Sequence, residues 1–428
     1  MSYDKFDDFK IANNIKKGIS NMGFEKPTPI QKKTIPLALK GIDVTGQAQT
    51  GSGKTLAFAI PILEKIFIPD NSPQAIILCP TRELCLQVAG EIKKVGKYIR
   101  KLKVLPVYGG EPIGRQLRVL KKGVHIIVGT PGRVIDHIKR GSLNLIGVES
   151  VVLDEADEML NMGFREDIEF ILRTTPKKRQ TLLFSATMPK EIRKIAKMYQ
   201  RKAKFIKVDS AKSIPKITQY AFKTDFRHKF EDLNTLIDVY DVKLALIFCN
   251  TKKSVDYVVR HLRRRDYSVD ALHGDMDQKA RDRVMNKFRN GNINILVASD
   301  VAARGIDVAD VDVVINYDVP QNPEYYIHRI GRTARAGANG FAFTLVMSGE
   351  FDALNNIKKA YKVNIKQKNI PTFAEIESVK NEAIMDEVKK SIKTDNLKRY
   401  IKIIEKNSSD RESAVKIAAG LLKMVREN

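Results

Sequence analysis

The segment from residue 48 to residue 55 most narrowly restricts what this chain can fold into. It reads Ala48-Gln49-Thr50-Gly51-Ser52-Gly53-Lys54-Thr55 and lies between an apolar stretch (42–48) and a helical pattern (56–67). Glycines in such a loop let backbone N–H groups approach an anion, and the helix behind them adds its positive end. The segment therefore predicts a strand–loop–helix phosphate cradle within an α/β sheet.

Each residue type in the loop suits a nucleoside triphosphate. Lys54 is expected to reach the β- and γ-phosphates, and the Thr55 hydroxyl is expected to bind Mg²⁺. Ala48 departs from the usual pattern, which has glycine at this first position. The nucleotide-binding residues predicted in the loop are Gln49, Thr50, Gly51, Ser52, Gly53, Lys54 and Thr55.

An acidic segment beginning at Asp154 is the second nucleotide-binding element. The apolar run 151–153 predicts a buried strand, so Asp154 and Glu155 leave its carboxyl end, where open α/β sheets bind ligands. We expect Asp154 to hold Mg²⁺ and Glu155 to polarise the attacking water. The alternative is a solvated helix start whose acids favour the positive helix end. The apolar strand directly before the acids favours the catalytic interpretation.

Bulk composition agrees with a large, basic, soluble protein. The chain has 428 residues, so two or three domains are expected. Its 75 Lys and Arg residues exceed its 50 Asp and Glu residues, giving a net charge of +25, which is typical of a protein with a polyanionic partner but also of a merely soluble surface. The sequence shows neither a membrane-spanning run nor a signal-like N-terminus, so we expect a cytoplasmic protein with no membrane partner.

The few metal-binding residue types show no metal pattern. Cys79, Cys85 and Cys249 form no C-x-x-C pair, and the six histidines lack metal spacing. Cys79 and Cys249 end apolar runs, so we expect buried, reduced thiols.

Short apolar runs alternate with helical stretches in two successive series, which predicts two parallel sheets covered by helices. The first series is 75–79, 104–107, 126–128, 151–153 and 181–184, and the second is 244–249, 268–272, 295–298, 313–315 and 341–345. A Ser-, Lys- and Pro-containing break around 207–217 predicts a linker. The segment 250–254 follows the first strand of the second series without any glycine, so the second lobe has no phosphate cradle of its own.

Ordered motifs cover residues 1 to about 365. They are 23–31 (GFEKPTPIQ), 48–55, 80–84 (PTREL), 109–110 (GG), 130–133 (TPGR), 154–157 (DEAD), 185–187 (SAT), Gln278 with Arg281, 303–307 (ARGID) and 328–335 (HRIGRTAR). In these motifs the chain resembles the DEAD-box RNA helicases of helicase superfamily 2. It departs from that family at Ala334, where Gly is usual, and at Ser299, where Thr is common.

This resemblance implies two tandem RecA-like parallel-sheet domains plus a small all-helical C-terminal segment. The expected boundaries are 1–208 for the ATP-binding domain, 209–217 for the linker, 218–365 for the second domain and 366–428 for a helical dimerisation-like region. The last region shows apolar positions at helical spacing, resembles the dimerisation region of bacterial cold-shock-type members, and should form a homodimer. The alternative is that its helices pack back onto the second lobe.

The resemblance also assigns roles in the ATP site. The Gln31 amide suits the edge of adenine, and Phe24 offers a stacking face, although a core position is the alternative for Phe24. Gly305 and Asp307 are expected to contact the nucleotide from the second lobe. Arg332 and Arg335 resemble arginine fingers that place positive charge beside the γ-phosphate. The catalytic residues predicted are Lys54, Asp154, Glu155, Arg332 and Arg335.

The expected RNA contacts go to sugar and phosphate, with little sequence readout and a preference for RNA through its 2′-OH. The residues predicted to make them are Arg82, Gly110, Thr130, Arg133, Gln278, Arg281 and Asp300. Residues predicted to couple hydrolysis to RNA binding are Asp157, Ser185, Thr187 and His328; for the two hydroxyl residues, a polar loop capping a helix is the alternative.

The sequence thus predicts an ATP-dependent RNA helicase with ATP and Mg²⁺ as cofactors. It should unwind short duplexes locally and remodel ribonucleoprotein, including ribosomal or RNA-decay assemblies. An ATP-gated RNA clamp or annealing scaffold without productive unwinding is the alternative, because the same closed complex would serve both. A DNA-directed helicase or translocase departs from the motif set.

Overall fold

A computed structural model describes residues 3–48, 51–208, 217–300, 311–334, 340–372, 397–407 and 411–427, with single residues 375, 385, 388 and 392. The chain divides into two compact units, Met1–Phe230 with Val242–Lys368 and Glu231–Asp241 with Asn369–Asn428. The first unit contains two seven-stranded sheets in which every paired strand is parallel, as the alternating pattern predicts.

The first sheet has the strand order β3-β4-β2-β5-β6-β1-β7. Its strands are β1 (Val44–Gln47), β2 (Ala75–Leu78), β3 (Val104–Val107), β4 (Ile126–Gly129), β5 (Ser150–Leu153), β6 (Gln180–Ser185) and β7 (Lys204–Lys207). In β2, Ile77 contributes to one hydrophobic core and Ile76 to the other. Both faces of the central strands are therefore buried, which is why these strands read as continuous apolar runs.

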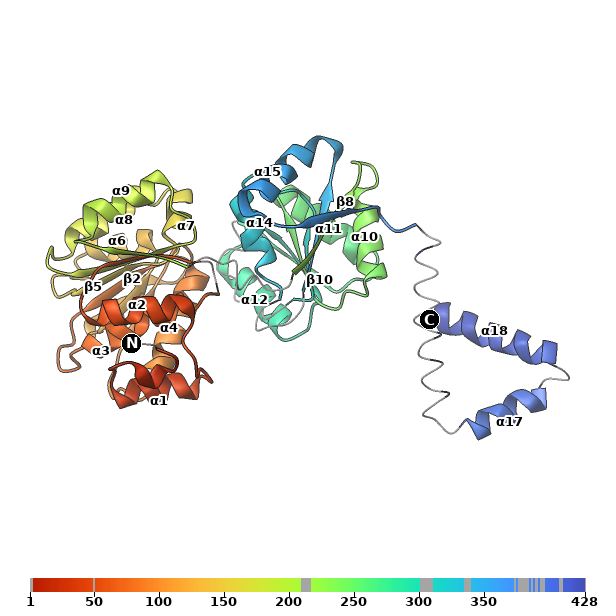
Figure 1. The fold of residues 1–428 in the computed structure, drawn as a ribbon, viewed down its shortest axis with the longest axis horizontal. Helices are drawn as coiled ribbons and strands as arrows, with labels where there is room; N and C mark the ends of the chain where they lie inside the picture. Colours follow the sequence, from red (N-terminus) through yellow and green to blue (C-terminus); the bar gives the residue numbers. More distant parts are fainter. Residues whose placement is uncertain are drawn as a thin grey trace. The chain divides into compact units, whose positions relative to one another are not determined.

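Helices cover both faces of this sheet (Figure 1). The core that includes Ile77 also contains residues of α1 (Asn13–Asn21), α2 (Pro29–Leu39), α3 (Lys54–Lys65) and α4 (Arg82–Val95). The core that includes Ile76 contains residues of α6 (Pro131–Lys139), α7 (Ala156–Asn161), α8 (Arg165–Thr174) and α9 (Lys190–Tyr199). The remaining helices are the 3₁₀ turn η1 (Phe6–Asp8) and α5 (Ile113–Lys121).

The second sheet has the order β10-β11-β9-β12-β13-β8-β14. Its strands are β8 (Ile217–Lys223), β9 (Ala245–Cys249), β10 (Val269–Leu272), β11 (Ile295–Ser299), β12 (Val313–Asn316), β13 (Gly340–Val346) and β14 (Ile365–Lys368). Its helices are α10 (Lys229–Val239), α11 (Lys252–Arg263), α12 (Gln278–Arg289), α14 (Pro323–Ile330), η4 (Ser348–Glu350) and α15 (Phe351–Tyr361). Leu246 packs with α12, and Ala342 packs with α14 and α15; the register Leu246↔Val314↔Ala342 puts these helices on one face.

Two strands cross the expected domain boundaries. β14 extends past residue 365 to Lys368 because it pairs along β8, with Lys366 opposite Tyr220. β8 itself begins at Ile217, the last residue of the expected linker. The rest of that linker, residues 209–216, lies outside the described residues.

The C-terminal segment contains two helices in its described part, α17 (Lys398–Asn407) and α18 (Arg411–Glu427), and they contact each other. The apolar positions at helical spacing expected between residue 366 and α17 fall largely outside the described residues. Among the described helices, none is both long enough and apolar enough to cross a membrane.

All three cysteines are free and buried, as predicted for Cys79 and Cys249. Burial raises the pKa of each thiol, to about 12 for Cys85. These thiols are core residues that stay protonated at neutral pH.

Candidate functional site

The candidate residues of the first domain lie along one edge of its sheet. The phosphate-loop residues follow β1, Asp154 and Glu155 follow β5, and the coupling residue Thr187 follows β6, whereas the residues predicted for RNA follow β2, β3 and β4. Since the sheet order is β3-β4-β2-β5-β6-β1-β7, the two sets occupy adjacent halves of the carboxyl edge. The boundary between them lies between β2 and β5, with Arg82 starting the helix after one strand and Asp154 following the other. Strand order alone therefore brings the two sites side by side.

The phosphate loop has the backbone that its glycines allow. Gly51 and Gly53 have φ of 78° and 86°, in the left-handed region that favours glycine. A Cβ on Gly53 would also overlap the Gln31 side-chain nitrogen. Gly53 is therefore required both by its conformation and by the close approach of α2.

The Gln31 amide is tied to this loop. Its Nε2 donates to the Gly53 carbonyl at 2.9 Å, and its Oε1 accepts from the Thr28 N–H at 2.8 Å. One N–H and one lone pair remain on the amide, which is what an adenine edge needs. The residue predicted to read the base thus also holds the phosphate loop, a link that sequence spacing does not show.

Lys54 has the environment of a phosphate ligand. Lys54 is the first residue of α3 and is only 6% exposed. Its Nζ has no hydrogen-bond partner among the described residues. A buried ammonium without a partner is costly, so the site fits an anionic group at this position. The triphosphate of ATP is such a group.

A cavity of about 750 Å³ contains these residues, a size suited to a nucleotide. Its lining includes Phe24, Thr28, Gln31, Gly51, Gly53, Lys54, Thr55, Asp154, Glu155 and Arg332. Phe24 is 46% exposed at this surface, so the alternative of a core position for Phe24 is wrong. Most of the residues predicted for ATP that the structure describes thus share one cavity.

The two acids leave β5 as expected. Glu155 has a left-handed backbone (φ 50°) and begins α7 without a side-chain capping hydrogen bond. Burial raises the pKa of Asp154 and of Glu155, and the positive charge of Lys54 opposes that rise. Neither carboxylate is used to cap the helix, which weakens the alternative of a solvated helix start.

Three of the predicted coupling residues meet beside this cavity. The Thr187 N–H and hydroxyl both donate to Asp157 Oδ2, at 2.7 and 2.9 Å, and the Ser185 hydroxyl donates to the Thr187 carbonyl at 2.6 Å. Burial alone would raise the pKa of Asp157, but the charge of Lys54 and the bonds from Thr187 outweigh burial and lower that pKa. Glu324 of α14, not predicted from the sequence, lies 3.2 Å from the Thr187 hydroxyl, and burial beside Asp157 raises its pKa to about 7.

The arginines predicted for RNA have distinct partners. Arg82 lies over the Tyr108 ring at 4.5 Å and pairs with Asp282 at 3.2 Å, while its Nε and Nη1 find no hydrogen-bond partner among the described residues. Arg281 pairs with Glu83 at 3.4 Å. Each arginine thus has a carboxylate neighbour where we predicted a phosphate.

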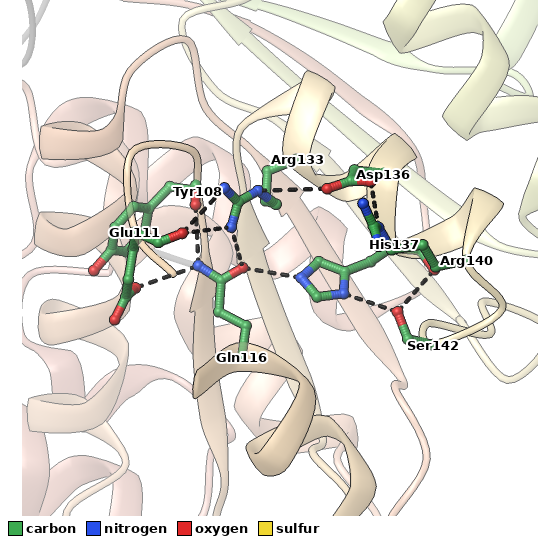
Figure 2. A network of polar contacts seen from close by, with 8 residues as sticks. All are labelled: Tyr108, Glu111, Gln116, Arg133, Asp136, His137, Arg140 and Ser142. Carbon is green, nitrogen blue, oxygen red and sulfur yellow. Dashed lines mark hydrogen bonds and ion pairs between the residues drawn. The ribbon is translucent and has the colours of Figure 1, made fainter. Parts of the chain in front are cut away.

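Gly110, Thr130 and Arg133 form the rest of the RNA set in the first domain. Gly110 is exposed with a φ of 77°, and Thr130 immediately precedes α6. The Arg133 guanidinium donates to the Glu111 carbonyl at 3.1 and 3.2 Å (Figure 2). The loop after β3 and the start of α6 are therefore connected through Arg133.

Comparison with known proteins identifies the family. Family profiles match the DEAD/DEAH box helicase domain over residues 28–195, the helicase conserved C-terminal domain over 228–337 and the RNA helicase DeaD dimerization domain over 371–428. The chain is 46% identical to the DEAD-box ATP-dependent RNA helicase CshA of Geobacillus kaustophilus, over 99% of this chain and 90% of the relative. The chain belongs to the DEAD-box RNA helicase family.

Other DEAD-box helicases show similar agreement. CshA of Bacillus subtilis is 44% identical over 99% of this chain and 85% of its own length. Among solved structures, S. cerevisiae Dbp5 bound to RNA and ADP BeF3 matches with a TM-score of 0.79 and 33% identity, covering 88% of this chain and 99% of that one. The resemblance noted in the sequence and the tandem RecA-like fold are thus confirmed.

In the second domain of this DEAD-box helicase, a buried arginine missed in the sequence organises the site. Arg329 donates to both carboxylate oxygens of Asp300 at 2.6 Å, to Asn250 Oδ1 at 2.8 Å and to the Asp318 carbonyl at 2.8 Å. Asp300, Asn250 and Asp318 follow β11, β9 and β12, so Arg329 joins the carboxyl ends of three strands. The Asp300 side chain is engaged by this pair, and its contact with RNA stays a prediction.

Several predicted residues lie outside the described residues. They are Gln49, Thr50, Gly305, Asp307 and Arg335, together with the side chain of Gln278, whose backbone starts α12. Arg332 is described and lines the nucleotide cavity. For nearby His328, burial lowers the pKa, while the charges of Glu155 and Asp157 oppose that change. Across the described residues, no cluster of three or more His, Cys, Asp or Glu could hold a metal ion.

Proposed function

We propose that this DEAD-box helicase unwinds short RNA duplexes locally and remodels ribonucleoprotein, and that it couples RNA-stimulated ATP hydrolysis to closure of its two domains, with closure as a precondition of hydrolysis. The proposal rests on the carboxyl edge of the first sheet, where the residues predicted for the nucleotide occupy one half and those predicted for RNA occupy the adjacent half. Its nucleotide half contains the buried Lys54 ammonium, which has no hydrogen-bond partner among the described residues, and the RNA half begins on the neighbouring strand. A structural change at the nucleotide half therefore has only to pass from one strand to its neighbour to reach the RNA half.

The roles in hydrolysis follow from this geometry. Lys54, with the loop backbone, binds the β- and γ-phosphates, and Thr55 and Asp154 would hold Mg²⁺, which neutralises phosphate charge when bound. Glu155 orients the attacking water and accepts its proton. Asp157 binds Thr187, whose carbonyl accepts from Ser185, and these contacts transmit the state of the nucleotide site toward the RNA.

Nucleic acid binding is proposed through sugar and phosphate. The residues are Arg82, Gly110, Thr130, Arg133, Gln278, Arg281 and Asp300, and the net charge of +25 supplies long-range attraction. Contacts of this kind follow the backbone with little sequence readout. We further propose a cytoplasmic location and ribosomal or RNA-decay assemblies as sites of action, in keeping with the bacterial RNA helicases to which the chain is similar.

A strand-displacement assay tests the proposed function. Blunt and tailed RNA duplexes are incubated with the full chain and either ATP or a non-hydrolysable analogue. Displacement of short strands that turns over with ATP supports unwinding. Tight binding in the presence of the analogue without displacement by ATP would instead support the alternative, an ATP-gated RNA clamp or annealing scaffold.

Nucleotide choice gives a separate prediction. Catalytic efficiency with ATP should exceed that with GTP by about tenfold or more, because guanine would leave the Gln31 amide facing unmatched groups at about 1–3 kcal/mol each. Steady-state kinetics with both nucleotides measures the ratio. A Gln31→Glu protein, which keeps the acceptor but loses the Nε2 donor to Gly53, should lose part of that preference. Equal efficiency of the parent with both nucleotides would show that the base edge is not read.

We also propose that residues 366–428 form a homodimer. The described apolar side chains of α17 and α18 include Tyr400, Ile401, Val415, Leu421 and Met424, all of them exposed in the single chain. Helices this short bury little apolar surface alone, so an exposed apolar set calls for a partner. The match to a dimerisation domain over residues 371–428 supports a second copy as that partner.

The full chain should therefore sediment as a dimer at micromolar concentration. The comparison protein should end after Lys368 so that β14 stays paired with β8, and it should be monomeric. Two joined motors should also bind a long RNA more tightly through effective concentration, without any new contact. A monomeric full chain, combined with lower thermal stability of the truncated protein, would instead favour helices that pack back onto the second domain.

A further inference from the structure

A buried glutamine stands at the centre of a polar network in the RNA half of the sheet edge. Gln116 is 2% exposed and is the buried residue of α5, whose other positions are at least partly exposed. A glutamine is mostly exposed in folded proteins, so its burial needs a compensating set of hydrogen bonds. Figure 2 shows that set, which joins α5, α6 and the loop after β3.

Every hydrogen-bonding position of the Gln116 amide is used. Its Nε2 donates to the Tyr108 carbonyl at 3.0 Å and to Glu111 Oε2 at 3.3 Å. Its Oε1 accepts from His137 Nε2 at 2.9 Å and from Arg133 Nη1 at 3.3 Å. Two donors and two lone pairs are the full capacity of the amide. Gln116 thus connects both sides of the glycine pair 109–110 to α6.

Arg133 is turned into the same network. Both terminal nitrogens of its guanidinium donate to the Glu111 carbonyl, and its Nε lies 3.8 Å from Asp136 Oδ2. Its side chain is only 15% exposed. Arg140, the C-terminal cap of α6, is 56% exposed and pairs with Asp136 at 2.6 Å. The contacts of the Arg133 guanidinium are thus made within the protein, to the Glu111 carbonyl, Gln116 and Asp136.

The network ends at His137 and Ser142. His137 is fully buried, and its Nδ1 lies 2.8 Å from Ser142 Oγ. Burial, and then the charge of Arg133, lower the pKa of His137. A neutral ring with the proton on Nε2 is the form that donates to Gln116 Oε1, while Nδ1 faces the Ser142 hydroxyl.

The network fixes the position of an exposed segment of backbone, the glycine pair 109–110. Gly109 and Gly110 are exposed, and a Cβ on Gly109 would meet nothing within 4 Å. An RNA phosphate bound by backbone N–H groups depends on the position of that backbone, since the groups cannot reorient as a long side chain can. The shape of the loop is set by the groups that bind it at Tyr108 and Glu111.

We infer that Gln116 is a positioning residue for RNA binding, and that Arg133 acts through the Glu111 carbonyl as a support for the 109–110 loop, with no direct contact to phosphate. The inference rests on the proposed function and refines the role that the sequence predicted for Arg133. It assigns the phosphate contact in this part of the site to backbone donors.

A double-mutant cycle on RNA affinity tests the inference in the full chain. Gln116→Leu and Arg133→Gln should each weaken binding of a single-stranded RNA by about tenfold or more, and the double variant should lose no more than the worse single variant, because both changes break one network. Arg140→Gln removes the same charge from the same helix and should bind RNA within about twofold of the parent. Losses that multiply in the double variant would overturn the inference.

Salt dependence separates a support from a phosphate ligand. Loss of one phosphate contact would make the slope of log affinity against log salt shallower by about 0.7. We expect Arg133→Gln to keep the slope of Arg140→Gln, with reduced affinity. A slope shallower than that of Arg140→Gln by about 0.7 would place Arg133 on phosphate and contradict the inference.

Hydrogen exchange without RNA keeps the inference testable if Gln116→Leu does not fold or if the parent does not bind RNA. Amides of residues 109–111 should exchange at least several-fold faster in Arg133→Gln than in the parent and in Arg140→Gln. Unchanged exchange there would overturn the positioning role while leaving the proposed function in place. If the parent protein neither binds RNA nor shows RNA-stimulated ATPase activity, that result contradicts the proposed function, whatever the exchange result.

Discussion

A Glu155→Gln protein should hydrolyse ATP about 10²- to 10⁴-fold more slowly than the parent while still binding ATP and RNA. The substitution keeps the size of the side chain but removes its ability to accept a proton. Glu155 lines the nucleotide cavity, and its side chain does not cap α7. Single-turnover hydrolysis with saturating RNA measures the chemical step, and fluorescent nucleotide titration measures binding. Turnover equal to that of the parent would show that Glu155 does not activate the attacking water.

The pH profile provides an internal check on Glu155. Burial raises the pKa of this carboxyl above its ordinary value, and a general base works only when deprotonated. Activity of the parent should therefore fall as the pH drops through that raised pKa, and Glu155→Gln should lack this limb. Glu166→Gln makes the same chemical change at an exposed position of α8 and should behave as the parent does. Lys54→Ala should differ from both by weakening nucleotide binding itself.

The central strands were predictable from the sequence because both of their faces are buried. Runs such as 75–79 and 244–249 are apolar at every position, and the structure contains a strand in each. The strands β7, β8 and β14 were missed. β8 lies inside the second sheet, but buried residues occupy only some of its positions. β7 and β14 lie at sheet edges, and the β7 sequence KFIK has one buried residue, Ile206, among exposed ones that include two lysines. Charged edge strands limit pairing with other chains, and for that reason they lack the apolar pattern of an inner strand.

Site residues could be predicted where a short sequence motif indicates a ligand directly. They could not be predicted where a residue acts by positioning other residues. Lys54 and Asp154 could be found because a glycine-rich loop and an acid after a buried strand are local signals. Gln116 and His137 have no such signal, since α5 and α6 read as ordinary amphipathic helices whose polar positions could all face solvent. Only the packed sheet brings their side chains to within 2.9 Å of each other.

The second large effect is expected from the arginines of the second domain. Arg332→Ala and Arg335→Ala should each reduce RNA-stimulated ATPase activity by about 10³-fold, the usual contribution of a positive charge that reaches the γ-phosphate in the transition state. Arg332 directly follows the C-terminus of α14 and lines the nucleotide cavity, and its charge is among those that act on Glu155. The segment 250–254 that follows β9 contains no glycine, so we expect the second domain to contribute to hydrolysis through side chains such as these.

The decisive measurement is the ratio of ATPase rates with and without RNA. If RNA binding brings the arginines to the phosphate, the Arg332→Ala rate with RNA should fall close to its own rate without RNA, so the loss appears in the stimulated activity. Arg264→Ala, a change of the same charge at the exposed end of α11, should keep full stimulation. Two results would contradict the proposal: a parent whose ATPase activity RNA does not raise, or an Arg332→Ala protein that RNA stimulates as strongly as the parent. The second result would place the transition-state charge on other groups, such as Arg335 or the buried Lys54.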